Sequence, residues 1–511
     1  MEGISKHPEK HILENLAGFA PLMSVLGKKR VVNMVEACCC EREAHVKLKS
    51  NPDMRPPMIL PYKCTQSTCS ACGIEKRFGD ILNHALIANN TEITAWVLIW
   101  EDAARQGEKK SGEKRTQLEL TEKLLSLKDL VTKFKQLLKE CIPHVADIQW
   151  IAITRQIDID TYPSCAILVM TDFAATLDLK AAETVNSSVD NHAWLDNFII
   201  LSNRRNIKVG EHEVIIHDCD VIQYFGSTMS KGKKNDYVSH NACLDCIFER
   251  YKREFRERGE ELRSAKVWTD NCSNQYKCKE NFSPIATIKD RQNLKLRHRF
   301  AIKDNFKGVW DAAGKVTKYF LSRLEKQGTR SPTTIACFKN LREHGYEIDD
   351  REEWKRLEET RSTKLLKKKT FTVTRRIVGL AVEDQDEYKR LSQEYENIVF
   401  TNHDPTQVPT LKKPVPNTQK LHEVASCSEP VSNESNVYYL LTAHLPCSCV
   451  DCRISALMAD GVCKECTYST RTKAKKERVV TTYKQIANGQ VNAGEAENDD
   501  DAMTGIANGS I

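Results

Sequence analysis

Three strand-like runs follow one another in the middle of the chain before any long helix. AILVMTDFAATLDL (166–179) is apolar enough for a buried strand, and DNFIILSNRR (196–205) and HEVIIHDC (212–219) come next, separated by the turn-like NIKVGE. A long helix with charged flanks is then predicted over 236–263. This order favours an α/β fold.

Strands and helices alternate after this point. SAKVWTD returns to a strand that ends at Asp270, a shorter helix is predicted near 281–288, and LRHRFAI (296–302) is a fifth strand candidate. Asp311 opens the next helix. One predicted face of that helix is apolar and carries Val316, Tyr319, Phe320 and Leu324. The complete order is three strands, helix, strand, helix, strand, helix.

Apolar residues spaced alternately four and three positions apart predict an amphipathic helix between Glu113 and Cys141. The apolar positions are Leu120, Leu124, Leu127, Val131, Phe134 and Leu138. Such a stripe is most often a face that packs on a core, and a coiled-coil dimer seam is the alternative.

Length and composition limit the class of protein. A chain of 511 residues is long enough for two or three domains, and 40% hydrophobic with 29% charged residues suits a soluble protein. No apolar run approaches the length of a membrane span, and MEGISKHPEK is no signal peptide, so we expect an intracellular protein. The net charge of +6 is modest. Two basic runs, KLLKKKTFTVTRR (364–376) and RTKAKKER (471–478), are therefore candidates for phosphate contact or nuclear import, with solvated surface as the alternative.

Twenty cysteines without a secretory signal favour thiols or metal ligands over disulfides. Near the N-terminus, Cys64, Cys69 and Cys72 precede Gly73, and the last pair forms a CxxCG knuckle. The spacing predicts zinc, with a fourth ligand among Cys38, Cys39, Cys40 and His45. Buried structural thiols are the alternative.

A second cluster lies near the C-terminus. Five thiols fall within twenty residues, namely Cys447, Cys449, Cys452, Cys463 and Cys466. They predict a structural zinc site with one spectator cysteine. A weaker candidate combines His217, Cys219, His240, Cys243 and Cys246, although HxxCxxC spacing also describes a buried helix face.

Three aspartates occupy related positions in the predicted topology. Asp172 leaves the first strand, Asp270 leaves the fourth, and Asp311 begins the helix after the fifth. If strands one and four are central neighbours, the first two carboxylates lie side by side and the third reaches in from above. Carboxylate oxygens with waters and phosphate oxygens suit magnesium, and two such ions promote in-line displacement at phosphorus. A P-loop is excluded, because five residues separate Gly308 from Gly314 and Val316 follows Lys315.

The stretches TDFAATLDL, VWTDNCSNQYK and HRFAIKDNFKGVWDAAGKVTK, in this order, resemble the catalytic core of transposon-derived proteins of the DDE/DDD transposase class. The resemblance covers about residues 140–330. It implies a ribonuclease H-like fold, a metal-binding triad of Asp172, Asp270 and Asp311, and magnesium or manganese as cofactor. It further implies DNA as partner, a homo-oligomer, a nuclear location, and phosphate contacts from Lys307, Lys315 and Lys318. The family often uses Glu at the third position, so Glu325 is the alternative to Asp311.

The domain organisation follows from these patterns. We predict an N-terminal region with a zinc knuckle (1–110), an amphipathic helix (111–150), a ribonuclease H-like catalytic core (151–330), a helical and basic extension (331–400), a flexible proline-containing linker (401–436), a cysteine-rich zinc region (437–485) and a disordered tail (486–511). The predicted function is metal-dependent cleavage and transfer of DNA strands. The alternative is a catalytically inactive, domesticated DNA- or chromatin-binding zinc protein.

Overall fold

The structure is a computed structural model of the whole chain. It describes residues 94–108, 114–126, 129, 132, 136, 147–148, 150–152, 154–179, 191–227, 237–272, 276–302, 306, 308–360, 370–401, 410–411, 413, 415–427, 437–444, 446 and 475–482.

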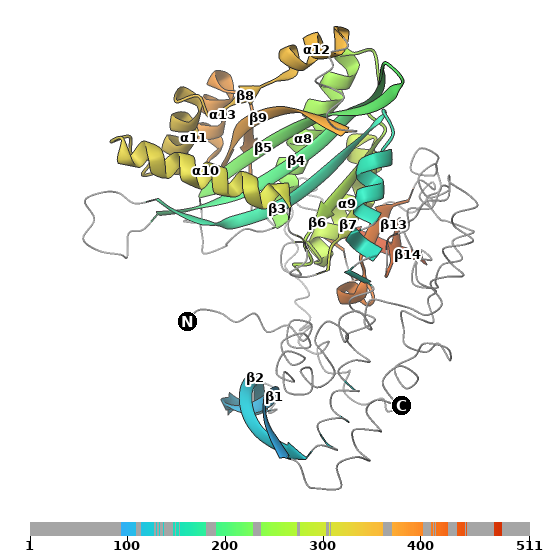
Figure 1. Ribbon diagram of the computed structural model, residues 1–511, viewed down its shortest axis with the longest axis vertical. Coiled ribbons are helices and arrows are strands. Elements are labelled where there is room, and N and C mark those ends of the chain that lie inside the picture. The colour runs from blue at the N-terminus through green and yellow to red at the C-terminus, as the bar shows by residue number, and fades with distance from the viewer. Residues whose placement is uncertain are drawn as a thin grey trace, which may run out of the picture.

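One sheet forms the body of the described chain (Figure 1). It has twelve strands in the order β10-β9-β5-β4-β3-β6-β7-β12-β13-β14-β11, and β8 pairs with β9 beside this path. The strand bounds are β3 Ala166–Leu179, β4 Asn191–Val209, β5 His212–Ser227, β6 Ser264–Thr269, β7 Lys295–Phe300, β8 Ile348–Asp349, β9 Thr370–Val382, β10 Ile398–Phe400, β11 Thr410–Leu411, β12 Glu423–Ser426, β13 Val437–Ala443 and β14 Lys475–Thr482.

The middle of the sheet has the predicted order of elements. Strands β3, β4 and β5 form an antiparallel meander, and β6 and then β7 add in parallel on the other side of β3. The turn predicted over NIKVGE is shorter than expected, because β4 continues to Val209. Only Gly210 and Glu211 separate the two strands, and glycine accepts the φ of +63° that this tight connection requires.

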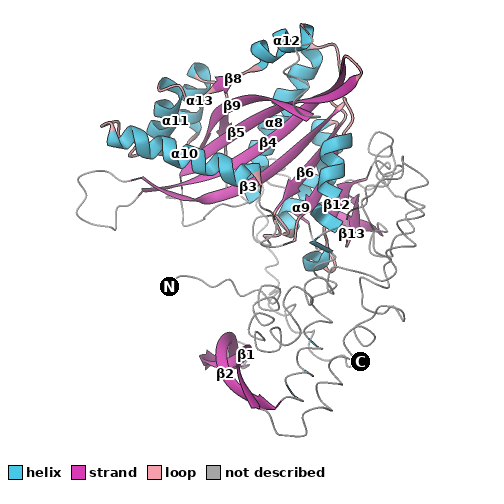
Figure 2. Cartoon of the chain, in the orientation of Figure 1, coloured by secondary structure: helices cyan, strands magenta, loops and turns pink. Residues whose placement is uncertain are grey.

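Helices cover both faces of the sheet (Figure 2). Their bounds are α8 Tyr237–Glu257, α9 Lys279–Gln292, α10 Val309–Lys326, α11 Thr334–Glu343, α12 Arg351–Glu359 and α13 Gln385–Glu394. Ile167 and Val169 of β3 pack in one cluster with α8 and α9, whereas Leu168 and Met170 pack with Trp310 of α10 on the opposite face. The run AILVM is apolar throughout because β3 is buried on both sides.

A buried ion cluster fixes the helical residues 154–161 to the parallel half of the sheet. Asp158 is fully buried, and its carboxylate accepts from Lys266 Nζ at 2.8 Å, Trp268 Nε1 at 3.0 Å and Arg299 Nη1 at 2.5 Å. Arg299 and Lys266 hold the pKa of Asp158 below its usual value against the opposing effect of burial. Glu423 of β12 lies 3.3 Å from Arg299 Nε and extends the cluster to the neighbouring strand.

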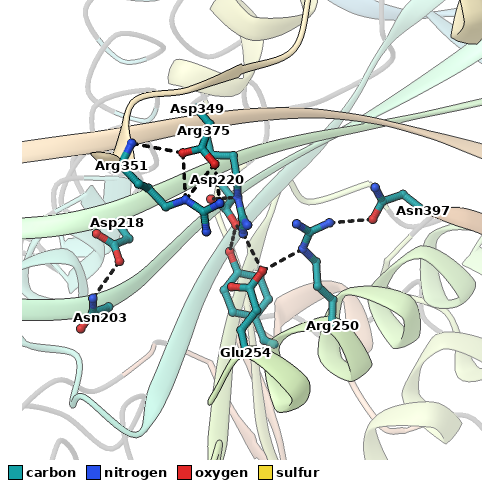
Figure 3. Close-up of polar contacts among 10 residues, drawn as sticks. Asn203, Asp218, Asp220, Arg250, Glu254, Asp349, Arg351, Arg375 and Asn397 are labelled. Carbon is teal, nitrogen blue, oxygen red and sulfur yellow. Dashed lines mark hydrogen bonds and ion pairs between the residues drawn. The ribbon is translucent and has the colours of Figure 1, made fainter. Parts of the chain in front are cut away.

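The basic run at 364–376 is in part a buried strand rather than a surface for phosphate. From residue 370 it forms β9, which pairs in parallel with β5. Arg375 is buried and contacts Asp220 through both Nε and Nη2, and its Nη2 lies 2.8 Å from Glu254 of α8 (Figure 3). Tyr251 donates to the same Asp220 carboxylate at 2.6 Å. Arg375 therefore neutralises buried carboxylates and joins β9 to α8.

Two further predictions are wrong in part. The amphipathic helix predicted over 111–150 is interrupted, because Lys114–Ser126 is strand β2, antiparallel to β1 (Thr94–Glu108), while residues 129, 132 and 136 are helical. The leucines at 118, 120 and 124 also fit a period of two, and the β-branched and aromatic run TAWVLIW offers a pairing partner. The linker predicted over 401–436 contains β12, whose residues Glu423–Ala425 pair with β7. Its prolines flank β12 and do not interrupt it.

Among the described residues, no helix is long and apolar enough to cross a membrane.

Asp158→Asn should destabilise the fold by about 3–5 kcal/mol, because it leaves Lys266 buried without its counter-charge and Arg299 with only the longer contact to Glu423. Urea denaturation at neutral pH measures the loss. The matched control is Asp160→Asn, two residues away, whose carboxylate accepts an exposed hydrogen bond from Gln156. The control should change stability by less than about 0.5 kcal/mol. Equal effects of the two substitutions would show that the cluster contributes nothing.

Candidate active site

Strand register brings Asp172 and Asp270 to the same level of the sheet. The last paired residues of the parallel strands β3 and β6 are Met170 and Trp268. Two residues further along each chain stand Asp172, within β3, and Asp270, directly after β6. Because adjacent strands are about 4.8 Å apart, the two aspartates lie side by side. The sequence predicts them as neighbours, but β3 continues to Leu179, so Asp172 lies inside its strand and not at the end of it.

The chain turns sharply after Asp270. One oxygen of its carboxylate accepts from the backbone N–H of Cys272 at 2.9 Å. The hydroxyl of Thr269 donates to the Asp270 carbonyl at 3.0 Å and lies 3.0 Å from Nε2 of the buried His298. Burial lowers the pKa of His298 well below its usual value, so this contact is made by a neutral imidazole. The hydrogen bonds fix where the peptide after β6 leaves the sheet.

Asp311 lies in the first turn of α10. Its Oδ2 accepts from the backbone N–H of Gly308 at 2.9 Å, which satisfies one of the free donors at the start of the helix. The next residue toward the N-terminus, Trp310, is buried and stacks on Phe306 with ring centroids 4.1 Å apart. A Cβ at position 308 would come within 2.4 Å of the Trp310 ring, so glycine is required there for space.

Asp172 and Asp311 line one pocket with two lysines. The pocket has a volume of about 210 Å³, and its lining consists of Asp172, Phe173, Asn197, Trp310, Asp311, Gly314, Lys315 and Lys318. Glu325, the alternative third carboxylate, is exposed fourteen residues further along α10, which is about 21 Å along the helix axis. The geometry therefore favours Asp311 over Glu325.

The carboxylates of this site repel one another. Burial, followed by the charges of Asp270, Asp311 and Asp196, raises the pKa of Asp172 to about 8. Asp270 is not part of the pocket lining, but its charge acts on Asp172. A cation in this place would offset the repulsion and favour the ionised form of Asp172.

A chain of buried neutral side chains joins Asp172 to α10. Asn197 Nδ2 donates to the backbone carbonyl of Asp172 at 3.4 Å, and Gln223 Nε2 donates to Asn197 Oδ1 at 2.6 Å. The Gln223 carbonyl oxygen accepts from the hydroxyls of Thr317 on α10 at 2.9 Å and Tyr346 at 2.6 Å. This network sets α10, and with it Asp311, against β3, β4 and β5. Sequence reasoning missed Asn197 and Gln223, although both are polar residues inside otherwise apolar strand runs.

The candidate zinc site around α8 is not formed. His240 is fully buried and its Nδ1 lies 2.9 Å from Asp196 Oδ2, whereas His217 on β5 contacts the Tyr162 hydroxyl. Cys243 packs in the cluster on the α8 face and Cys219 in the cluster on the opposite face. The HxxCxxC spacing therefore marks the side of α8 that packs on the sheet, with His240 fully buried there.

Metal geometry is incomplete in the described part of the chain. No three His, Cys, Asp or Glu side chains come together there as a group that could hold one ion. Two of the three aspartates are engaged in local hydrogen bonds instead, Asp270 with Cys272 and Asp311 with Gly308. The predicted zinc ligands Cys64, Cys69, Cys72, Cys447, Cys449, Cys452, Cys463 and Cys466, together with Lys307, lie outside the described residues.

No protein-family model, curated protein or solved structure matches the chain. The residues and their geometry are thus the only basis for a function.

Without divalent metal, Asp172 should make stability fall as pH rises. Its pKa is about 8 in the folded chain and about 3.9 in an unfolded one, so between these values only the unfolded chain releases the proton. The free energy of unfolding then decreases by up to about 1.4 kcal/mol per pH unit. Asp172→Asn lacks this proton and should gain stability over the wild type as pH increases. Urea denaturation in EDTA at pH 5 and pH 8 measures the free energy of unfolding of both proteins. If the stability advantage of Asp172→Asn over the wild type does not grow with pH, the raised pKa is contradicted.

Proposed function

We propose that the chain is a metal-dependent phosphoryl transferase acting on DNA, similar to transposases of the DDE/DDD class. The observation that carries the proposal is the pocket in which Asp172 and Asp311 lie with Lys315 and Lys318, with Asp270 directly after the neighbouring strand β6. The pKa of Asp172, raised by burial and by the charges of Asp270 and Asp311, supports it. Buried carboxylates that lie close enough to repel one another on central strands are typical of sites that bind dications.

The topology supports a ribonuclease H-like core. Three antiparallel strands are followed by two parallel ones in the spatial order β5-β4-β3-β6-β7, with Asp172 on the central strand of these five. This strand order fits the resemblance of the aspartate motifs to transposases.

The donor types present suit magnesium or manganese, although the three carboxylates are not gathered into one group among the described residues. All three acidic ligands offer hard oxygen donors, and the buried Asn271 Oδ1, next to Asp270, has no hydrogen-bond partner among the described residues. When bound, two such ions activate a water or hydroxyl nucleophile and stabilise the leaving oxygen. Asp172, Asp270 and Asp311 would hold them.

The lysines would bind the substrate backbone. Lys315 and Lys318 line the pocket one helical turn apart, where their ammonium groups would contact phosphate oxygens of a DNA strand. We assign the same role to Lys307. A nuclear location and a homo-oligomeric assembly belong to this proposal as implications of the family resemblance.

Asp270→Asn should abolish DNA cleavage and preserve the fold. The substitution removes one negative charge from the metal site at nearly constant size, so strand cleavage should fall by about a hundredfold or more. The assay follows nicking and strand transfer in MgCl₂ or MnCl₂ on DNA that carries the sequences flanking the gene. Magnesium should also raise the Tm of the wild type more than that of the variant.

The matched control is Asp290→Asn, an exposed aspartate on α9, which should cleave like the wild type. DNA binding by Asp270→Asn should stay intact, because lysine and arginine contacts dominate it. If the wild type binds DNA but cleaves in neither metal, the protein is the inactive DNA- or chromatin-binding derivative.

We further propose that the two cysteine clusters outside the described residues hold structural zinc. Freshly purified, reduced protein should contain about two zinc ions per chain, released by a chelator together with loss of order in the flanking regions. Elemental analysis checks the count, and a zinc-free preparation that keeps its full circular dichroism signal would exclude the clusters as zinc sites.

A further inference from the structure

Helix α10 exposes an apolar stripe next to the carboxylate pocket. Val309 is 58% exposed, Val316 43% and Tyr319 73%. The three side chains share one side of the helix, since 309 and 316 are seven residues apart and 316 and 319 three apart, and exposed Ala312 lies between them. The sequence pattern predicts Val316, Tyr319 and Leu324 on one apolar face, but only Leu324 is buried in the structure.

Lys315 connects this stripe to the pocket. On the side of the pocket, Lys315 is a helical neighbour of Asp311, four residues earlier, and of Lys318, three residues later. On the side of the stripe, it is a helical neighbour of Ala312, three residues earlier, and of Tyr319, four residues later. A phosphate held by Lys315 therefore has the carboxylates on one side and the Tyr319 ring on the other.

The charges around the stripe indicate which kind of molecule can bind there. The ionised side chains that border it on α10 are Lys315, Arg323 and Lys326, whereas the two acids of α10, Asp311 and Glu325, lie on other sides of the helix. An isologous contact between two copies of this stripe would bring like charges together. A polyanion with apolar flat faces is complementary to it, which is the chemistry of a nucleic-acid strand with unpaired bases.

We propose that Val309, Val316 and Tyr319 form a stacking platform for an unpaired nucleotide of the strand whose phosphate enters the carboxylate pocket; the proposal rests on the proposed action on DNA. Tyr319 supplies a rigid aromatic ring for a base, and the two valines supply flat apolar contact beside it. A duplex hides the faces of its bases and cannot use this platform. The preferred substrate is therefore DNA with a frayed or single-stranded segment next to the scissile phosphate.

The experiment measures binding without cleavage. The full chain, in EDTA, is titrated into a single-stranded oligodeoxynucleotide that carries 2-aminopurine and, separately, into the matching duplex. Tyr319→Ala should bind the single strand about tenfold more weakly, as expected for the loss of one stacked base, with an unchanged affinity for the duplex. Tyr319→Phe should restore wild-type binding and fluorescence quenching, because the ring and not the hydroxyl carries the interaction.

Two controls separate stacking from charge and from general surface change. Lys315→Ala should reduce the dependence of log affinity on log salt concentration by about 0.7 for a single strand, whereas Tyr319→Ala should leave this slope unchanged. Ile348→Ala removes an exposed apolar side chain on β8 and should bind like the wild type.

Equal binding by Tyr319→Ala and the wild type would overturn the platform, as would equal losses on single strand and duplex. Sedimentation showing that Tyr319→Ala dissociates a dimer would assign the stripe to a second copy and also overturn it. If Tyr319 is needed for single-strand binding but the wild type never cleaves in either metal, the platform stands and the phosphoryl-transfer proposal fails.

Discussion

The carboxylate of Asp158 holds together the half of the sheet on which the candidate site depends. It is buried, yet three donors from β6 and β7 satisfy it, so the desolvation of the charges is offset by close pairing. The contacts clamp β6 and β7 beneath the helical residues 154–161. The end of β6 is thereby fixed beside β3, and Asp270 leaves the sheet next to Asp172. Toward the other edge of the sheet, Arg375 of β9 contacts Asp220 of β5 and Glu254 of α8. These contacts fix β9 in the same way.

The element order and the three aspartates could be predicted because each is encoded locally. The central strands are apolar runs bounded by turn residues; Asp172 follows the apolar run that begins β3, Asp270 follows β6, and Asp311 lies in the first turn of α10. Strands β9 and β12 could not be predicted, since what buries them lies far away in the sequence. Arg375 reads as part of a basic surface run until Asp220, 155 residues earlier, is placed beside it. The segment at 114–126 fits both helical and strand periods, and only pairing with β1 decides between them.

The candidate site combines repulsion with neutral support. Asp172 is crowded by two other acids, and the side chains that position its neighbourhood, Asn197 and Gln223, carry no net charge. Amides can satisfy buried backbone and hydroxyl groups without adding to the negative potential. Charged support here would either neutralise the acids permanently or deepen their repulsion. The network therefore adds no charge of its own beside Asp172.

Helix α10 carries more apolar residues than it buries. Trp310, Thr317 and Leu324 are buried against the sheet, and they suffice to hold the helix in place with the hydrogen bond from Thr317 to Gln223. Val309, Val316 and Tyr319 are largely exposed to solvent and contribute less to this packing. Scattered exposed apolar residues are ordinary on protein surfaces, but these three share one side of one helix and adjoin a charged pocket through Lys315. An apolar residue that the fold does not bury is informative about function when its neighbours supply the complementary chemistry, and on α10 that chemistry is positive charge beside an aromatic ring.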